Sequence, residues 1–326
     1  YNTKDLWDAP TDNNWSLISV RENGDLTITG NGTLEAKEDD CYAVDIQDAD
    51  AKVTIENGTF IGNITAVYVH PGKLVIKGGS YSIKQLNSNN VQDSYGLTIN
   101  CKDEDYRDGT AQVLITGGTF NHFNPVNNAA EGTGTSFATS GYETAEETDG
   151  SYTVQVKSDN AAVIDDVQYA TLADAVAAAQ GGATVKLLKD VTENVVIPAG
   201  KIVTLDLNGK KIVNSTTAQD SKVANDARKH TITNNGTLTI MDSVGGGVVD
   251  NVSHGRAALY NNGTITEIKG GKFTRSVDNS TDSESANGNS WYVVYNAEGA
   301  TISKISNGEF LALGHFSSLF SNCGTI

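Results

Sequence analysis

The sequence is poor in the residue types that build disulfide scaffolds, kinks and metal centres. Its 326 residues include three Cys, four Pro, one Met and five His. The cysteines are odd in number and widely scattered, without the spacing of metal ligands, which argues against a disulfide framework and a zinc site. They are Cys41, Cys101 and Cys323. We expect Cys41 and Cys101 to be buried thiols, because each adjoins an equivalent short strand.

Positive charge is scarce as well. The chain has 23 Lys and Arg against 40 Asp and Glu, which gives a formal net charge of −17. Such a surplus of negative charge repels phosphate backbones and anionic lipid headgroups. We therefore expect neither nucleic acid nor a membrane as a partner, and solubility explains the acidic balance.

Recognisable active-site motifs are also missing. There is no P-loop, no Rossmann fingerprint, no nucleophile elbow and no Gly-rich Ca²⁺ nonapeptide. A glycoside hydrolase needs two carboxylates that face one cleft, and the acidic residues that could supply them fall at or beside predicted turns, where charges are usually solvated. These are Asp39, Asp40, Asp45, Asp48, Asp103, Glu104 and Asp105, with Arg107. Because the five His are also dispersed, we predict no catalytic residue, no metal ion and no cofactor.

No apolar stretch resembles a signal peptide or a membrane span. The chain begins with Tyr1 rather than Met, and Gly324–Ile326 look like the start of another alternating strand. We expect it to be a piece of a longer polypeptide.

What the sequence does contain is a repeated phrase. A Gly or a small residue leads into an alternating strand, which is followed by Asn or Gly, then Gly, a small polar residue and an aromatic residue. The phrase occupies Ala51–Phe60, Gly72–Tyr81 and Ala111–Phe120, and in looser form residues 24–34, 236–249, 263–273 and 299–310. Such a repeat at a spacing of roughly 20 to 40 residues is typical of a solenoid, in which each coil buries its apolar side chains by stacking on its neighbours.

Within one coil the apolar residues alternate, which predicts strands with one inward face. The inward pairs are Val53 and Ile55, Leu74 and Ile76, and Val113 and Ile115. Another short strand precedes each phrase, at residues 42–46, 65–69, 95–99, 256–260, 291–295 and 316–320. The Asn-Gly and Gly-Gly pairs are expected to turn corners with positive φ. Hairpins are the alternative interpretation of Asn-Gly, and the Asn-Gly-Thr sites also match a glycosylation pattern that the corners already explain.

The repeat lapses after Phe120 and restarts later. Gly141–Tyr152 predict a closing hairpin with its turn at Asp149-Gly150. Thr171 is expected to cap a helix over Leu172–Gln180, which Gly181 and Gly182 end and which lies as a lid on an open solenoid end. Strands at residues 184–188, 195–197 and 202–207 then restart the coiling. We predict an all-β chain of two solenoid domains in tandem, residues 1–157 and 158–326, with one short capping helix near 171–180.

Surface aromatic residues are the best functional candidates. The candidate sugar-stacking residues are Tyr68, Tyr95, Trp291, Tyr292 and Tyr295, from a wider set that includes Trp7, Trp15, Tyr81 and Tyr106. Strand alternation predicts that Tyr292 points to one side and Trp291 and Tyr295 to the other, so one set is expected to be exposed. Core packing is the alternative role for each of these residues.

Two segments carry a resemblance to a known family. Residues 117–137, with Gly141-Tyr142 and residues 150–154, look like the terminating element of pectate-lyase-like β-helix proteins of gut bacteria and their tailed phages. Residues 167–191 and 205–210 are similar to the solenoid start of the same group. The resemblance implies right-handed parallel β-helices on the outside of a cell or virus particle. It supplies no functional residue, because such domains often lack an assignable active site.

We therefore expect a non-catalytic structural or attachment module of an exposed phage component, such as a fibre, a spike or a capsid decoration, at the virion surface. Its expected partners are other virion or surface proteins and host surface glycans. A bacterial cell-surface adhesin is the alternative, and a polysaccharide lyase or hydrolase is the third hypothesis. A homotrimer is a candidate assembly because viral fibres are commonly threefold, although no heptad run is present to enforce it.

Overall fold

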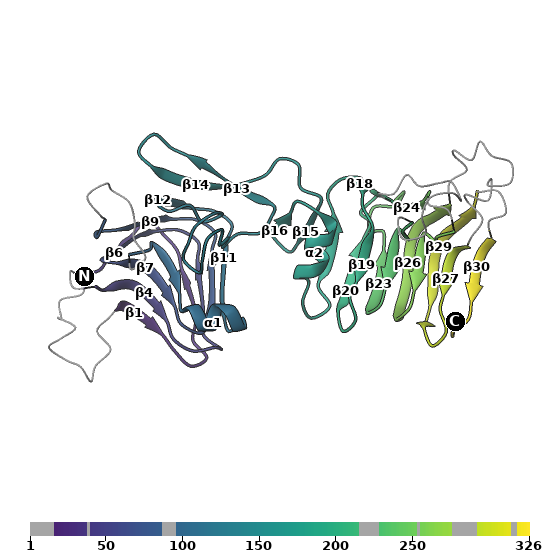
Figure 1. Cartoon of the computed structure of the whole chain (residues 1–326), viewed down its shortest axis with the longest axis horizontal. Coiled ribbons are helices and arrows are strands. Elements are labelled where there is room, and N and C mark those ends of the chain that lie inside the picture. Colours follow the sequence, from purple (N-terminus) through teal and green to yellow (C-terminus); the bar gives the residue numbers. More distant parts are fainter. Residues whose placement is uncertain are drawn as a thin grey trace. The chain divides into compact units, whose positions relative to one another are not determined.

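The computed structural model describes residues 16–37, 40–86, 96–214, 228–252, 255–275, 292–313 and 318–326. These residues form 30 strands and two short helices, joined mainly into parallel sheets (Figure 1). The all-β prediction is confirmed, and the parallel pairing of successive coils is consistent with a β-solenoid. The contacts divide the chain into two compact units, Tyr1–Lys157 and Ser158–Ile326.

Each coil of unit 1 contributes one strand to each of three sheets. The first sheet contains β1 (Ser16–Val20), β4 (Tyr42–Ile46), β7 (Thr65–Val69) and β10 (Ile99–Cys101). The second contains β2 (Asp25–Ile28), β5 (Lys52–Ile55), β8 (Gly72–Ile76) and β11 (Ala111–Ile115), and the third begins with β3 (Thr33–Glu35), β6 (Thr59–Gly62), β9 (Ser80–Ile83) and β12 (Thr119–Asn121). Val53 pairs with Leu74, and Leu74 with Val113, so equivalent apolar residues form rows along the unit. The predicted inward residues are buried except Val113, which is half-buried.

An antiparallel hairpin ends unit 1, as the sequence predicts. It consists of β13 (Tyr142–Glu146) and β14 (Ser151–Val156), and β14 pairs antiparallel with β12. Its turn is fixed by Asp149, whose Oδ1 accepts hydrogen bonds from the backbone N–H and the hydroxyl of Ser151 at 3.0 and 2.6 Å. The hairpin thus occupies the free edge of β12, which would otherwise be open to another strand.

The first helix is a correction to the sequence interpretation, which placed its charged residues in turns and expected a single helix. Helix α1 spans Asp103–Asp108 between β10 and β11. Acidic residues fill its first turn and Arg107 its last, which matches the helix dipole. Gly109 ends the helix with φ 84°.

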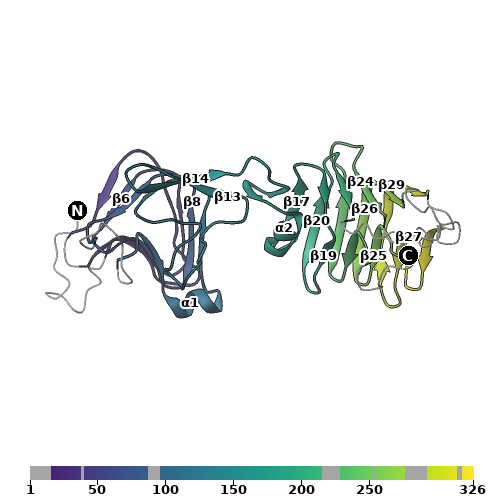
Figure 2. The same ribbon diagram turned by 45° about the horizontal axis from the view of Figure 1, so that its top comes forward.

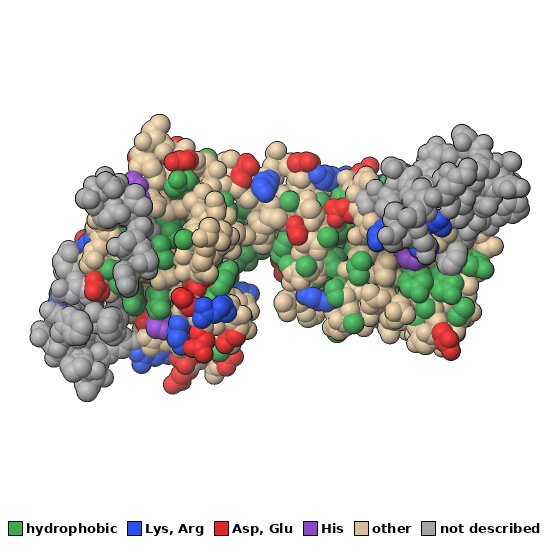
Figure 3. All heavy atoms as spheres, viewed as in Figure 1, with side chains coloured by type: hydrophobic (Ala, Val, Ile, Leu, Met, Phe, Trp, Pro, Cys, Tyr) green, Lys and Arg blue, Asp and Glu red, His purple; other side chains and the backbone are tan. Residues whose placement is uncertain are grey.

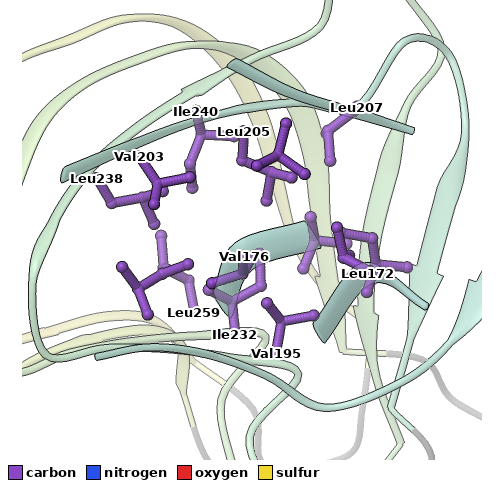
Figure 4. Packing of buried hydrophobic residues seen from close by; sticks show 14 of the residues in the cluster. Leu172, Val176, Val195, Val203, Leu205, Leu207, Ile232, Leu238, Ile240 and Leu259 are labelled. Carbon is purple, nitrogen blue, oxygen red and sulfur yellow. The ribbon is translucent and has the colours of Figure 1, made fainter. Parts of the chain in front are cut away.

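The second helix confirms the predicted lid on unit 2. Helix α2 spans Leu172–Ala178, and the Thr171 hydroxyl accepts a hydrogen bond from the Asp174 N–H at 3.0 Å. Leu172, Ala175 and Val176 are buried. Figure 4 shows Leu172 and Val176 pointing toward apolar residues of the first coils, Val195 among them. The helix therefore closes one end of the apolar interior of the unit.

The strands of unit 2 stack as rungs along its length (Figure 2). A large sheet contains β15 (Ala162–Ile164), β16 (Val167–Tyr169), β17 (Thr184–Leu187), β18 (Val191–Thr192), β20 (Ile202–Asp206), β21 (Lys211–Val213), β23 (Thr237–Met241), β24 (Val248–Asn251), β26 (Thr264–Arg275), β28 (Thr301–Ile302) and β29 (Ile305–Ala312). The other contains β19 (Val195–Ile197), β22 (Ile232–Asn234), β25 (Leu259–Asn261), β27 (Tyr292–Asn296) and β30 (Ser318–Asn322). The 12-residue strand β26 joins what would otherwise be two sheets, because it pairs with both β23 and β24.

Two predicted strands begin later in the structure than expected. Strand β25 starts at Leu259 instead of residue 256, and β10 starts at Ile99, so that residues 96–98 of the predicted strand lie outside it. Ala257 and Ala258, within the predicted strand, are both buried. The chain bends at Ala258 and becomes a strand only at the next residue.

The glycine corners follow two different physical rules. Gly118 has φ +104°, as predicted for a corner that favours glycine. Gly263 does not have a positive φ, so the prediction is wrong at that position. A Cβ on Gly263 would lie 2.3 Å from the carbonyl oxygen of Gly236 in the preceding coil. Close stacking of backbones, and not backbone conformation, therefore requires the glycine there.

Two buried ladders hold the coils in register. In unit 1, Phe60, Tyr81 and Phe120 stack with ring centroids 5.1 and 4.7 Å apart, and Tyr81 is buried, so it is not a surface aromatic residue as the sequence suggested. In unit 2, the buried Asn234, Asn261 and Asn296 and the exposed Asn322 bond to each other from coil to coil. The amide of Asn234 donates to Asn261 at 2.8 Å, that of Asn261 to Asn296 at 2.7 Å, and that of Asn296 to Asn322 at 2.8 Å.

Candidate functional site

Tyr68 lies on the outer face of the first sheet of unit 1. Asp45 on β4 pairs in register with Tyr68 on β7, and Tyr68 pairs with Asn100 on β10. His70 and Lys102 follow the ends of β7 and β10. We call the outer residues Tyr42, Asp45, Tyr68, His70, Asn100 and Lys102 the unit-1 face.

Aromatic and ionisable groups are in direct contact on the unit-1 face. The Tyr68 ring stacks on Tyr42 with centroids 5.1 Å apart and meets the His70 ring edge-on at 4.5 Å. The His70 Nε2 lies 3.5 Å from Oδ1 of Asp45, a carboxylate that is buried and that also accepts a hydrogen bond from Gln47 at 2.5 Å. Burial lowers the pKa of His70, and the Asp45 charge opposes that shift. Burial and the nearby Glu131 charge raise the pKa of Tyr68 to about 12.

Glu131 closes the end of the unit-1 face. Its Oε1 accepts a hydrogen bond at 3.2 Å from the N–H of Cys101 on β10. Burial, chiefly, raises the pKa of Glu131 to about 7. Cys101 and Cys41 are buried thiols outside any disulfide, as predicted.

The acidic run of α1 borders the same face. Asp103, Glu104 and Arg107 are exposed, in agreement with the prediction of solvated charges, whereas that prediction is wrong for Asp45, which is buried within β4. Lys102 lies 3.4 Å from Asp105. Figure 3 shows acidic and basic side chains gathered over α1. The unit-1 face is therefore a mixed polar surface with a negative border.

The second group of aromatic residues lies on unit 2. The rings of His230 and Tyr260 stack with centroids 4.4 Å apart, and those of Tyr260 and Tyr295 stack at 5.3 Å with an interplanar angle of 4°. Tyr292 lies 6.0 Å from Tyr295. We call His230, Tyr260, Tyr292 and Tyr295 the unit-2 column. All four side chains are half-exposed.

The unit-2 column corrects the expected alternation. Tyr292 and Tyr295 were predicted to point to opposite sides, yet their rings are neighbours, while Val293 and Val294 are both buried. Strand β27 pairs with β30 from Tyr292 onward, but with β25 only from Val294 onward, opposite Leu259. At this start of β27 the side chains do not alternate strictly between the inside and the outside, because the consecutive residues Val293 and Val294 are both buried.

The orientation of the rings decides what the column offers to a ligand. Because Tyr260 and Tyr295 cover each other's faces, they present mainly ring edges and hydroxyl groups to solvent. Tyr295 is the last tyrosine of the row and pairs in register with the small residue Ser321, and its hydroxyl lies 3.7 Å from Sγ of Cys323. Among the described residues, the far face of the Tyr295 ring is thus less covered than the ring faces inside the column.

His230 has a fixed tautomer. Its Nδ1 accepts a hydrogen bond from the N–H of Ala257 at 2.9 Å, which leaves the proton on Nε2. Burial, together with the positive charges of Arg256 and Arg275, lowers the pKa of His230 to about 3. The imidazole is therefore neutral at physiological pH and acts as a hydrogen-bond donor.

Of the five predicted stacking residues, the structure places three. Tyr68 lies on the unit-1 face and Tyr292 and Tyr295 in the unit-2 column, whereas Tyr95 and Trp291 lie outside the described residues. Sequence reasoning missed Tyr260, His230 and His70. A signal for Tyr260 was present, because Ala-Leu-Tyr-Asn at 258–261 matches Val-Val-Tyr-Asn at 293–296. No comparable signal marked the two histidines, which belong to different coils.

Within the ranges that the structure describes, no three His, Cys, Asp or Glu side chains are grouped so that they could hold a metal ion. None of the helices in those ranges has the length and apolar character needed to cross a membrane. No family model, no curated protein and no solved structure matches the chain. The resemblance to pectate-lyase-like proteins therefore stays a prediction.

Proposed function

We propose that this chain is a non-catalytic attachment module that binds surface glycans, built from two right-handed parallel β-helices in tandem. The observation that carries the proposal is the unit-2 column, a row of aromatic rings and hydroxyl groups that crosses neighbouring coils on an outer face. Tyrosine combines an apolar ring with a polar tip, which suits it to sugars that carry both C–H and O–H groups.

The packing of the coils favours this proposal, because it makes the sheet that carries the column rigid. Parallel strands repeat in register from β22 through β25 and β27 to β30, and the buried asparagine ladder runs beneath them. Side chains on this sheet therefore keep a fixed spacing, which reduces the entropy lost when an extended ligand binds.

The proposed location is the surface of a virion or of a cell, with other surface proteins and host glycans as partners. A phage fibre, spike or capsid decoration and a bacterial adhesin make the same physical demands on the module. Immunogold labelling of phage particles and of bacterial cells distinguishes the phage component from the bacterial adhesin. Sedimentation velocity of the purified chain tests the proposed homotrimer, and a single monomeric species would contradict it.

The glycan-binding proposal is tested by measuring binding of immobilised neutral and acidic oligosaccharides. Replacement of Tyr295 by Ala is expected to weaken binding about tenfold, since an aromatic contact contributes about 1.4 kcal/mol. Tyr152→Ala is the matched control, because Tyr152 is half-exposed on β14, in the other unit. Absence of binding across the whole panel, or equal losses in both variants, would contradict the proposal.

A polysaccharide depolymerase is the second candidate, and the unit-1 face favours it. Asp45 lies within 3.5 Å of His70, and Glu131 has a pKa of about 7, the range useful for proton transfer near neutrality. Incubation with capsular and pectic polysaccharides should release shortened oligosaccharides if this candidate is correct, and Glu131→Gln should abolish the release. Intact polymers after prolonged incubation would reject it.

A further inference from the structure

Basic side chains gather at one edge of the unit-2 column. Arg228 and Lys229 precede His230, and Arg256 precedes Ala257, whose N–H bonds to His230 from the next coil. Arg228 and Arg256 are half-exposed and Lys229 is exposed. We call Arg228, Lys229 and Arg256 the basic cluster. It stands out because the chain as a whole has 40 acidic residues against 23 basic ones.

Hydrogen bonds to the backbone hold the cluster in place. The Arg256 Nε donates to the carbonyl oxygen of Arg228 at 3.2 Å, and its Nη1 donates to that of Gly255 at 2.8 Å. The carbonyl oxygen of Lys229 accepts a hydrogen bond from Asn251 at 3.1 Å. The Arg256 guanidinium is thus fixed by neighbouring coils and loses little freedom when it meets a ligand.

The electrostatics agree with this geometry. Burial lowers the pKa of Arg256, and the positive charge of Arg228 lowers it further. Arg256 in turn contributes to the low pKa of His230. Cations that perturb one another lie close together, and an anion that binds between them gains Coulomb energy from each.

We infer that the unit-2 column and the basic cluster form one binding surface for glycans that carry carboxylate or sulfate groups. The inference rests on the glycan-binding function proposed above and narrows it to a chemical class. The tyrosines contact the sugar rings, while Arg228 and Arg256 bind the anionic groups, for which the planar guanidinium provides paired N–H donors. In Figure 3 hydrophobic side chains gather over β27 and β30, with a histidine and basic side chains beside them.

The unit-1 face and the unit-2 column differ in the charge of the residues around them. The unit-1 face has Asp45 within it and Glu131, Asp103 and Asp105 at its border, and these charges disfavour an anionic ligand. An acidic glycan is therefore expected to select the unit-2 column. A glycan without charge has no such preference.

The experiment compares acidic glycans with uncharged counterparts of the same backbone. Fragments of hyaluronan, oligogalacturonide and chondroitin sulfate are measured beside their carboxyl-reduced and desulfated forms, using the whole chain. At least one acidic fragment is expected to bind at least tenfold more tightly than its uncharged form, and the difference should shrink as NaCl rises from 50 to 500 mM because salt screens the contact.

Two variants assign the effect to the cluster. Arg256→Gln is expected to remove most of the preference for acidic fragments and of the salt dependence. Because Arg256 also bonds to the backbone, Lys229→Gln serves as a second variant, and unfolding temperatures show whether each variant is folded. Lys304→Gln is the control, since Lys304 is an exposed cation of the same unit that pairs with Glu267 on the other sheet.

The outcomes separate the inference from the function on which it rests. Equal binding of acidic and uncharged fragments, or an unchanged preference in folded Arg256→Gln and Lys229→Gln proteins, would overturn the inference and leave glycan binding intact. Absence of binding to every fragment would overturn both. The Lys304→Gln control could also lower the preference for acidic fragments as much as the two variants do. That result would show that the basic cluster is not the site that binds the anionic groups.

Discussion

At the scale of single residues, Asn261 shows how much a buried amide can stabilise. Its amide group donates to Asn296 at 2.7 Å and to the carbonyl oxygen of Thr301 at 3.0 Å, and its Oδ1 accepts from Asn234 at 2.8 Å. The side chain is therefore shared by three coils. Neither an apolar nor a shorter polar residue can replace all of these bonds.

Asn261→Ala is expected to lower the free energy of unfolding by about 3 kcal/mol, because it leaves several buried polar groups without partners. Asn262→Ala is the matched control. Asn262 lies next in the chain but bonds at the exposed surface to Asn235, so its loss should cost about 0.5 kcal/mol or less. Urea denaturation of both variants checks the difference, and similar costs would contradict the importance of the ladder.

Glu131 predicts a pH dependence with a definite sign. Folding raises its pKa from an ordinary 4.5 to about 7, so the folded state favours the protonated carboxyl. This contribution to stability is fully present below about pH 4.5 and is lost as the pH rises through 7. Between pH 5 and pH 8, Glu131→Gln should therefore lose less stability than the parent protein does. Parallel denaturation curves at the two pH values check this, and an equal or larger loss in the variant would show that Glu131 is not the group responsible.

At the scale of elements, the N-terminus of α2 is held by hydrogen bonds from two different parts of the chain. Thr171 caps it by accepting the N–H of Asp174. Glu193, which lies between β18 and β19, accepts the N–H groups of Leu172 and Ala173 at 3.0 and 3.1 Å. The helix N-terminus is therefore held by its own cap and by a carboxylate from the first coil.

Thr171→Ala should destabilise unit 2 by about 1 kcal/mol, and Thr171→Ser should restore most of that loss because serine retains the accepting oxygen. Thermal unfolding followed by circular dichroism measures both variants. If alanine and serine behaved alike, the hydroxyl would not be the stabilising group, and the Glu193 carboxylate would account for the cap.

At the scale of the whole molecule, the two units are expected to fold independently. Each has its own apolar interior and its own closing element, the β13–β14 hairpin in unit 1 and α2 in unit 2. The fragments 1–157 and 158–326 should each be soluble, give β-type circular dichroism spectra and unfold cooperatively. Their summed spectra should equal that of the whole chain. Aggregation or an unfolded spectrum of either fragment would contradict the prediction of two domains.

The sequence by itself determined the coil. The alternation of Val53 and Ile55 and the return of Leu74 and Ile76 predicted inward rows that the structure pairs in register, and Thr171 predicted the start of α2. These features are local, because a strand face or a helix cap depends on residues a few positions apart.

Only the tertiary structure decided which residues from different coils meet. His230, Tyr260 and Tyr295 are far apart in the sequence, and the number of residues between coils varies, so no fixed spacing announces that their rings stack. The same holds for Asp45 beside His70. The alternation also fails at the start of β27, where Val293 and Val294 are both buried and the rings of Tyr292 and Tyr295 are neighbours. A solenoid thus encodes its coils locally, while its outer surfaces arise from the register between coils, which stacking of the whole backbone sets.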